Sequence, residues 1–239
     1  MTQPRTLIVL PALNEAGNIT RVIHNIRKHV PWAQILVIND GSTDATATLA
    51  AQAGALVLSM PFNVGIGAAV QTGFKFAERA GYQVVVRNDG DGQHAAEDIE
   101  RLVQELLRGD ADVIIGSRFL GSGGDYGTSF ARRAGILMIA GLLSRITHQR
   151  ITDPTSGFAA FNQRAIRLFA RVYPHDYPEP EAIVALHRSG LTLREVPATM
   201  RPREAGHSSI TLLRSPIYMF KVTLAILISL LRRAPTPEA

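Results

Sequence analysis

Two aspartates, Asp89 and Asp91, stand one residue apart in the stretch RNDGDGQH (87–94), directly behind the apolar run YQVVV. Side chains two positions apart on a strand point the same way, so the two carboxylates converge if the strand continues. Converging carboxylates need a counter-charge, and oxygen ligands of this kind favour Mg²⁺ or Mn²⁺. Gln93 stands within reach as a third ligand, and Gly90 leaves room for phosphates to approach. The pattern predicts a divalent metal site beside a diphosphate; the alternative is a solvated acidic turn with Asp89 as a helix cap.

The composition limits the chemistry. The chain has 239 residues, of which 46% are hydrophobic and 19% charged, as expected of one large globular domain or one domain with a small appendage. The absence of cysteine excludes disulfides, thiolate metal sites and thiol catalysis. The N-terminal stretch MTQPRTLIVLPALNE lacks the apolar core and cleavage site of a signal peptide, so we expect a cytoplasmic protein.

The net charge of +5 comes almost entirely from the C-terminal part. Residues 201–239 carry 6 basic and 2 acidic side chains beside the most apolar stretch, whereas residues 1–200 carry 19 and 18. This pairing favours an anionic membrane surface as partner. No groove-binding motif with interleaved aromatic and basic residues accompanies it, so we expect no nucleic-acid partner.

The elements that must position the aspartates alternate between strands and helices. Short apolar runs rich in β-branched residues predict strands at 6–10, 33–40, 55–60, 82–89 and 111–119. Amphipathic patterns between them predict helices at 18–29, 44–53, 67–80 and 96–108. This alternation is typical of an α/β fold with a parallel sheet and crossover helices.

The loops that follow the strands carry the unusual polar residues. In an open parallel sheet the ligand binds outside the carboxyl ends of the strands, so these loops meet at one edge. That edge gathers Asn14, Glu15, Asp40, Asp44, Asn63, Asp89 and Asp91. The segment VGIGAAV has Val70 at the third glycine position of a dinucleotide fingerprint and so fails it. Gly65 and Gly67 instead predict a tight turn into a helix whose amides face a phosphate or ribose, or a simple loop-to-helix turn.

Six segments in fixed order resemble family 2 glycosyltransferases of the GT-A fold: PALNEAGNI, VINDGSTDAT, NVGIGAAVQTG, NDGDGQH, VIIGSRF and DPTSGFAAFN. The most similar branch is that of the dolichyl- and polyprenyl-phosphate sugar transferases, and the resemblance covers residues 5–205. It implies a Rossmann-like, mostly parallel sheet flanked by helices.

The resemblance also implies roles for individual residues of the donor site. Pro11, Ala12, Asn14 and Glu15 would shape the base and ribose pocket, and Asp40 would bind the base or ribose. The remaining nucleotide-sugar contacts would come from Gly67, Asp89, Gly90, Asp91 and Arg203. Asp89, Asp91 and Gln93 would hold the metal. Asn88 departs from the family pattern, in which an apolar residue is usual.

The acceptor side depends on basic residues. Arg118 ends the fifth predicted strand at the same sheet edge, and Arg133 follows a glycine-rich loop, so their guanidinium groups could grip an acceptor phosphate. Asp153 would lie near the acceptor and the sugar, with an ordinary N-cap or turn residue as the alternative. The catalytic set is therefore Asp91, Arg118 and Asp153. Glu179 or Glu181 could touch sugar hydroxyls, but the sequence does not separate them.

The chain divides into three predicted regions. Residues 1–209 form the catalytic domain, 210–233 a helix that lies in the membrane interface or packs on protein, and 234–239 a disordered tail. The apolar stretch 217–231 is shorter than the roughly twenty residues a spanning helix needs. We expect the protein to be peripheral on the inner face of the cell membrane.

The predicted activity is a metal-dependent, inverting transfer of a sugar from a nucleotide diphosphate sugar to a polyprenyl phosphate of the undecaprenyl or dolichyl type. UDP is preferred over GDP or dTDP as the nucleotide. One alternative acceptor is a glycan or lipid-linked oligosaccharide, for which Asp153 would have to act as a base. A non-catalytic nucleotide-sugar-binding module is a second alternative. A homo-oligomer and a small membrane subunit stay open as partners.

Overall fold

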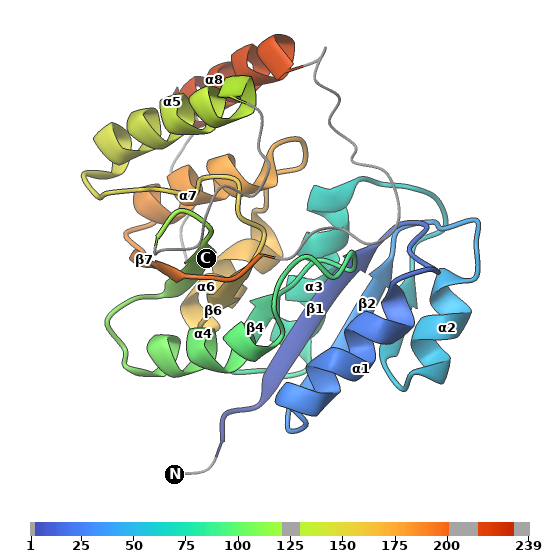
Figure 1. Ribbon diagram of the computed structural model, residues 1–239. Coiled ribbons are helices and arrows are strands. Elements are labelled where there is room, and N and C mark those ends of the chain that lie inside the picture. The colour runs from blue at the N-terminus through green and yellow to red at the C-terminus, as the bar shows by residue number, and fades with distance from the viewer. Residues whose placement is uncertain (1–2, 121–129, 201–214, 232–239) are drawn as a thin grey trace.

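The computed structural model describes residues 3–120, 130–200 and 215–231, and shows a sheet with helices on both faces (Figure 1). Its strands are β1 (Thr6–Ala12), β2 (Gln34–Asn39), β3 (Leu56–Ser59), β4 (Val84–Arg87), β5 (Val113–Ser117), β6 (Ala159–Phe161) and β7 (Leu193–Pro197). Its helices are α1 (Ile19–His29), α2 (Thr46–Gln52), α3 (Ile66–Arg79), α4 (Glu97–Leu107), α5 (Phe130–Thr147), α6 (Gln163–Arg171), α7 (Pro178–Arg188) and α8 (Ser215–Leu231).

The seven strands form one mixed sheet in the order β3-β2-β1-β4-β6-β5-β7. All neighbours are parallel except β6, which runs antiparallel to both β4 and β5. Every residue of β1, β4 and β5 is buried, as expected of strands covered on both faces. The prediction of a mostly parallel sheet flanked by helices is confirmed.

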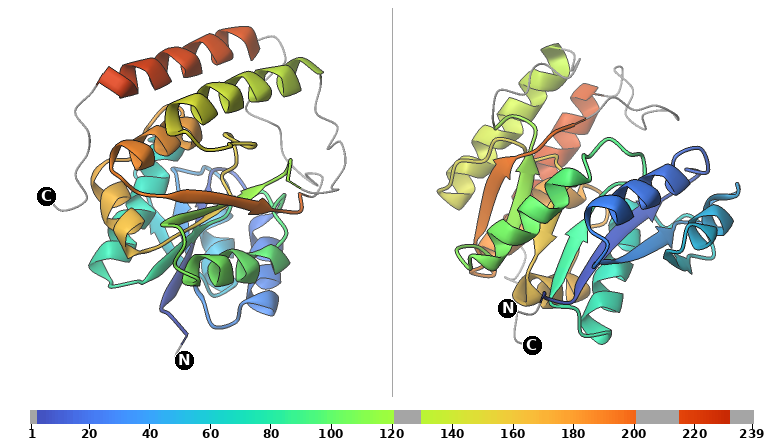
Figure 2. Two further views of the ribbon diagram at one scale, coloured as in Figure 1. Left: turned by 90° about the vertical axis from the view of Figure 1, so that its left-hand side faces the viewer. Right: turned by 60° about the horizontal axis from the view of Figure 1, so that its bottom comes forward.

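Two apolar layers cover the sheet (Figure 2). Helices α1, α2 and α4 pack on one face, and α1 does so through Ile19, Val22, Ile23 and Ile26, which recur at helical spacing. Helices α3, α6 and α7 pack on the other face, with α5 and α8 outside them. The two layers pack on opposite faces of the sheet and so hold the strands, whose carboxyl ends position the loops.

Helices α5 and α8 lie side by side (Figures 1 and 2). Gly135 of α5 allows this approach, because a Cβ atom there would lie 2.8 Å from the sulfur of Met219 on α8. α8 lies within the range 210–233 predicted as an apolar helix and buries Val222 and Ile226. Within the described residues, no helix combines the length and apolarity needed to cross a membrane. The predicted domain boundary at 209 and the tail 234–239 fall outside the described ranges.

Candidate active site

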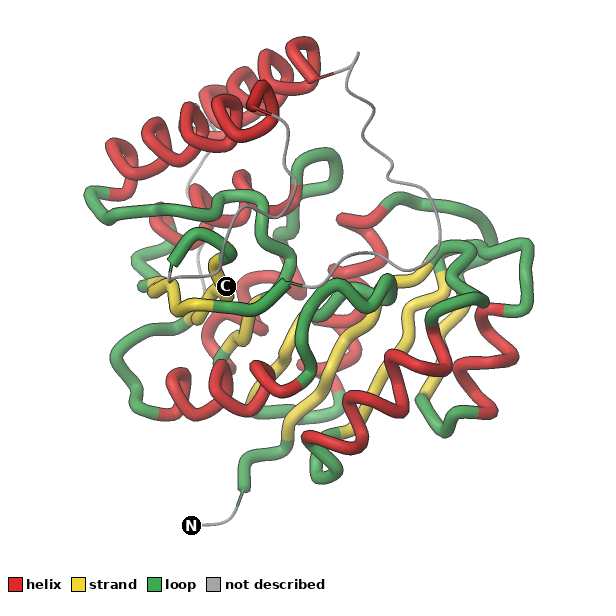
Figure 3. Tube along the Cα trace, viewed as in Figure 1, coloured by secondary structure: helices red, strands yellow, loops and turns green. Residues whose placement is uncertain are grey.

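The loops after β1 and β2 are tied together at the carboxyl edge of the sheet (Figure 3). Asn14 adopts a left-handed backbone conformation with φ 54°, and its Oδ1 accepts a hydrogen bond of 2.9 Å from the amide of Thr43. The Glu15 amide donates to the Thr46 hydroxyl at 2.8 Å. Pro11 and Ala12 are buried at the end of β1. These four predicted pocket residues therefore lie in one segment, which hydrogen bonds to the loop after β2 hold in place.

Asp40 braces the next loop. Its Oδ1 accepts from the amide of Val64 at 2.8 Å and its Oδ2 from the amide of Gly65 at 3.1 Å. The side chain is buried, and Gly65 has φ 92°, a conformation that favours glycine. The contact of Asp40 with a base or ribose stays a prediction, because the structure shows both oxygens engaged with the loop before α3.

Gly67 lies in the first turn of α3, and its contact with a nucleotide sugar stays a prediction. A Cβ atom at Gly67 would lie 2.2 Å from the carbonyl oxygen of Pro174 and 2.5 Å from Cα of His175. The glycine is required because the start of α3 packs directly against backbone from the segment between α6 and α7. Gly90 shows a milder case, with a Cβ position 3.2 Å from the carbonyl oxygen of Pro11.

Asp89 lies between two cationic or ionisable side chains at the end of β4. Its Oδ1 is 3.6 Å from Nη2 of Arg87, and its Oδ2 is 3.4 Å from Nε2 of His94. The His94 ring stacks on Phe158 at 4.9 Å between centroids. Burial alone would raise the pKa of Asp89, but the hydrogen bond from His94 and the charge of Arg87 outweigh it and lower the pKa well below its usual range. Asp89 is therefore a carboxylate at any physiological pH.

Asp91 and Gln93 lie with Asp89 in the loop between β4 and α4 (88–96), called the carboxylate loop below. The backbone amide of Gln93 donates to Oδ1 of Asp91 at 3.0 Å, which fixes the turn. Both residues are half-buried. Within the described residues there is no group of three His, Cys, Asp or Glu side chains that could hold a metal ion. Mg²⁺ and Mn²⁺ do not require one, since they are commonly held by one or two carboxylates together with substrate phosphates. Asp89 and Asp91 with the Gln93 amide fit that requirement.

Arg87 is a buried cation that the sequence analysis did not single out. Its Nη2 lies 2.6 Å from Oε1 of Glu179 on α7, and its Nη1 donates to the Tyr173 hydroxyl at 3.2 Å. Arg87 is only 4% exposed. Burial raises the pKa of Tyr173 to about 12 and outweighs the opposing effect of Arg87. The only signal in the sequence is a charged residue that closes an otherwise apolar strand.

The structure distinguishes Glu179 from Glu181, which the sequence alone does not. Glu179 faces the carboxylate loop through its ion pair with Arg87. Glu181 instead accepts a 3.0 Å hydrogen bond from the Ser229 hydroxyl on α8, so it belongs to the α7–α8 contact. Gly157 also borders the site, because a Cβ atom there would lie 2.9 Å from Nη2 of Arg87 and 3.0 Å from Oδ2 of Asp89.

Arg118 and Asp153 form a buried, bidentate ion pair. Arg118 Nε donates to Oδ2 of Asp153 and Nη2 to Oδ1, both at 2.6 Å, and Asp153 is 0% exposed. Among the described residues, Nη1 of Arg118 has one polar or sulfur atom within hydrogen-bond reach, the Met200 sulfur at 3.9 Å. Burial alone would lower the pKa of Arg118, but its hydrogen bonds and charge pairing with Asp153 raise it. This geometry amends two expectations: Arg118 has one nitrogen left for an acceptor phosphate, and Asp153 is a poor candidate for a base because both its oxygens are bound to a cation.

The roles of Arg133 and Arg203 stay predictions. Arg133 is exposed in the first turns of α5, and Arg203 lies outside the described residues. Glu195 on β7 was not predicted, yet its carboxylate accepts from the amides of Thr152 and Asp153 at 2.8 and 2.9 Å. Burial raises the pKa of Glu195 despite these hydrogen bonds. Glu195 therefore holds the backbone that presents Asp153 to Arg118.

Comparison with known proteins identifies the family of the chain. Residues 7–169 match the family model described as glycosyl transferase family 2. The chain belongs to glycosyl transferase family 2. Its curated relatives include the polyprenol monophosphomannose synthase of Mycolicibacterium smegmatis, 32% identical over 91% of this chain and 85% of the relative. The undecaprenyl-phosphate mannosyltransferase of Micrococcus luteus is 31% identical over 87% of this chain and 88% of the relative.

Solved structures share the fold of this family 2 transferase. The glucosyl-3-phosphoglycerate synthase of Mycobacterium tuberculosis, in complex with Mn²⁺, UDP and glucosyl-3-phosphoglycerate, aligns with a TM-score of 0.71 and 23% identity, covering 95% of this chain and 80% of that one. An identity this low shows the GT-A fold alone. The family match shows that the chain is a glycosyltransferase, and nucleotide sugars are the donors that its family and neighbours support.

Proposed function

We propose that this family 2 transferase moves a sugar from a nucleotide diphosphate sugar to a polyprenyl phosphate, with inversion of the anomeric carbon. The observation that carries the choice of acceptor is an exposed apolar face on α5 and α8. Leu137 and Met138 of α5 are 62% and 53% exposed, and α8 adds Leu224, Leu227, Ile228 and Leu231. Figure 1 shows these helices on the side of the molecule toward which the carboxyl end of β1 points. A lipid acceptor would approach the site from that side.

The names of the relatives support the same acceptor class, since those from Mycolicibacterium smegmatis and Micrococcus luteus are named for polyprenol and undecaprenyl phosphate. They also make mannose the first sugar to test. UDP is the first nucleotide to test, ahead of GDP and dTDP.

The transfer needs little proton chemistry. A phosphate oxygen of the acceptor attacks the anomeric carbon, the bond from that carbon to the diphosphate oxygen breaks, and its electron pair leaves with the nucleoside diphosphate. Because the acceptor is already an anion, no strong general base is required. Arg118 would contact the acceptor phosphate through Nη1, and Asp153 keeps that guanidinium oriented. Asp89, Asp91 and Gln93 would hold Mg²⁺ or Mn²⁺, which neutralises negative charge on the diphosphate.

The test is a transfer assay with a panel of labelled donors and matched acceptors. We expect label from a UDP-, GDP- or dTDP-sugar to move to undecaprenyl phosphate in the presence of Mn²⁺, giving a product that partitions into organic solvent and releases free sugar in mild acid. Transfer to 3-phosphoglycerate or to a soluble glycan instead would overturn the proposed acceptor. If none of the donors in the panel is turned over, catalysis by the described site is contradicted.

We further propose that the exposed face of α5 and α8 contacts the cytoplasmic surface of the membrane, so that residues 210–233 act as a peripheral anchor. Replacing two half-exposed side chains (Leu227→Ser with Ile228→Ser) removes on the order of 1 kcal/mol of apolar contact each. We expect sedimentation with phosphatidylglycerol vesicles to weaken by about tenfold or more. The control is Leu107→Ser, which changes an equally exposed leucine at the end of α4. Equal loss in both proteins would mean that α8 is not the contact.

A further inference from the structure

Glu195 on β7 holds a hydrogen-bond network beside the pair of Arg118 and Asp153. Its carboxylate accepts from the Thr152 amide at 2.8 Å, from the Asp153 amide at 2.9 Å and from the Thr152 hydroxyl at 2.6 Å. Hydrogen bonds to an ionised carboxylate are roughly twice as strong as those between neutral groups. The segment that presents Asp153 to Arg118 is therefore held from β7.

The Thr152 hydroxyl extends this network to the other partner of the ion pair. Because it donates its one hydrogen to Glu195, the Ser117 hydroxyl must be the donor in their 2.7 Å contact. The Ser117 oxygen in turn accepts from the Phe119 amide at 3.2 Å. Through this relay of hydroxyl groups, the two chain neighbours of Arg118 are tied to the carboxylate of Glu195.

The relay ends where the orientation of the Arg118 guanidinium is decided. Nε and Nη2 of Arg118 donate to Asp153, and Nη2 also donates to the Thr155 hydroxyl at 2.6 Å. The backbone amide of Arg118 donates to the same Asp153 carboxylate at 3.0 Å. A guanidinium is planar, so fixing two of its nitrogens also fixes the direction of the third, Nη1.

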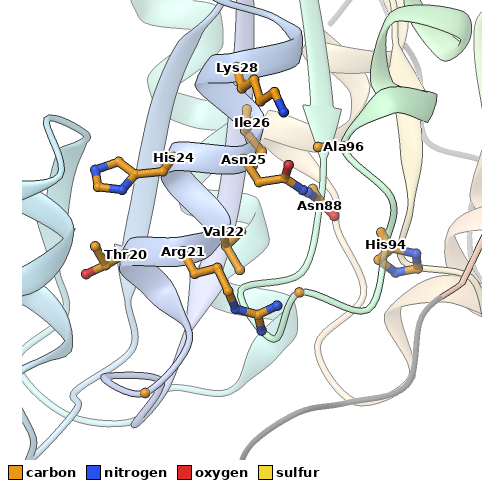
Figure 4. Close-up of a pocket in the computed structure, with 12 residues that line it drawn as sticks. Thr20, Arg21, Val22, His24, Asn25, Ile26, Lys28, Asn88, His94 and Ala96 are labelled. Carbon is orange, nitrogen blue, oxygen red and sulfur yellow. The ribbon is translucent and has the colours of Figure 1, made fainter.

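The strand that carries Glu195 is itself held at the active-site edge. It pairs in parallel with β5, and the amide of Ala198, just beyond β7, donates to the Ser117 carbonyl at 2.9 Å. Met200 forms an antiparallel bridge with His94 in the carboxylate loop. Figure 4 shows His94 on the side of that loop away from the α1 side chains. The segment around Glu195 therefore contacts both β5 and the carboxylate loop, which makes it a fixed reference for Arg118.

We propose that Glu195 is a positioning residue for the acceptor. It does not touch the substrate; through Thr152 and Ser117 it orients the Arg118 guanidinium so that Nη1 points at the acceptor phosphate. The identity of that phosphate rests on the proposed function, whereas the orientation of Arg118 does not. A merely structural role of Glu195 would instead lower stability without a selective effect on the acceptor.

Thr152→Val breaks the relay and leaves both amide bonds to Glu195 in place. We expect the KM for farnesyl phosphate, a short isoprenyl phosphate, to rise by about tenfold or more, with the KM for the donor unchanged. Thr152→Ser keeps the hydroxyl and should keep the native KM for the acceptor. The matched control is Thr192→Val, because the Thr192 hydroxyl donates to the buried Asp112 at 3.2 Å, at the opposite end of β5 and β7.

Two results would overturn the positioning role. One is an equal rise of the acceptor KM in Thr152→Val and Thr192→Val, and the other is an equal rise of the donor and acceptor KM in Thr152→Val. Glu195→Gln removes the charge at the end of the relay and should raise the acceptor KM further. If this variant folds poorly, Thr152→Val still decides, because it changes only the hydroxyl.

The orientation of Arg118 is measured without any substrate. Its Nε hydrogen, identified in protein labelled with ¹⁵N-arginine by its loss in Arg118→Lys, is donated to Asp153 at 2.6 Å. Its exchange with solvent should quicken by about tenfold or more in Thr152→Val and stay native in Thr192→Val, because exchange requires this hydrogen bond to open. Unchanged exchange in Thr152→Val overturns the role. If the native protein transfers no sugar to farnesyl phosphate while exchange quickens in Thr152→Val, the proposed acceptor fails and the orienting role of Glu195 stands.

Discussion

Replacing Arg87 by methionine (Arg87→Met) should lower the free energy of unfolding by about 3–5 kcal/mol, measured by urea titration. The substitution keeps much of the side-chain volume but leaves Glu179 without its cation, 2.6 Å away in the native protein. It also removes the charge 3.6 Å from Asp89. An uncompensated carboxylate in a partly buried position is the costly outcome, more than the loss of the ion pair itself.

A second variant separates these two contributions. Adding Glu179→Gln to Arg87→Met removes the stranded charge, so the double variant should recover a large part of the lost stability. Arg108→Met is the matched control, since Arg108 is 63% exposed in its pair with Glu105, and its loss should cost at most about 1 kcal/mol. If Arg87→Met is no more destabilising than Arg108→Met, the buried network does not hold β4 against α7.

Replacing Asp91 by asparagine (Asp91→Asn) should reduce metal-dependent sugar transfer by more than about 100-fold, the upper end of what the loss of an outer-shell partner costs a metal site. Asparagine keeps the size of the side chain and an oxygen that can accept from the Gln93 amide, so the turn is retained. What is lost is one negative charge at the position predicted to hold Mg²⁺ or Mn²⁺. The readout is the initial transfer rate as a function of Mn²⁺ concentration.

Asp110→Asn is the control for this experiment, because Asp110 is exposed on the opposite, amino-terminal edge of the sheet, before β5. It should transfer sugar at the native rate. A native rate for Asp91→Asn at every Mn²⁺ concentration would refute the metal role of the loop. A higher Mn²⁺ requirement with a preserved maximal rate would mean that Asp91 binds the cation without contributing to the transfer step.

The first half of the fold could be predicted from the sequence because its information is local. Each strand from β1 to β5 is a short apolar run and each helix from α1 to α4 an amphipathic one, so their order alone brings Asn14, Asp40 and Asp89 to one edge. The prediction that Asp89 and Asp91 lie together in the loop at this edge needed only their spacing and the strand before them, and the structure places both in the loop after β4. These residues are close in space because their strands are neighbours.

The rest of the site depends on contacts between residues far apart in the chain. Nothing in the pattern around Glu179 indicates that it meets Arg87, because that pairing depends on how α7 packs across the sheet. The bidentate pairing of Arg118 with Asp153 could not be predicted from the sequence either, because the two residues are far apart in the chain and the sequence suggests a separate role for each. The close packing that requires glycine at position 67 could not be predicted for the same reason, because the backbone of Pro174 approaches from a distant segment.

The antiparallel strand β6 has a consequence for how the enzyme folds. Ala159, the first residue of β6, pairs with Arg87 and Ile115, so the segment before it enters at the edge where β4 and β5 end. Both partner strands precede β6 in the chain, and closing so long a loop is slow. During synthesis the loops after β1 and β2 can therefore order first, whereas Asp153 and Gly157 arrive only when β6 inserts. The order in which the chain emerges thus leaves Arg118 without Asp153 until the sheet has closed.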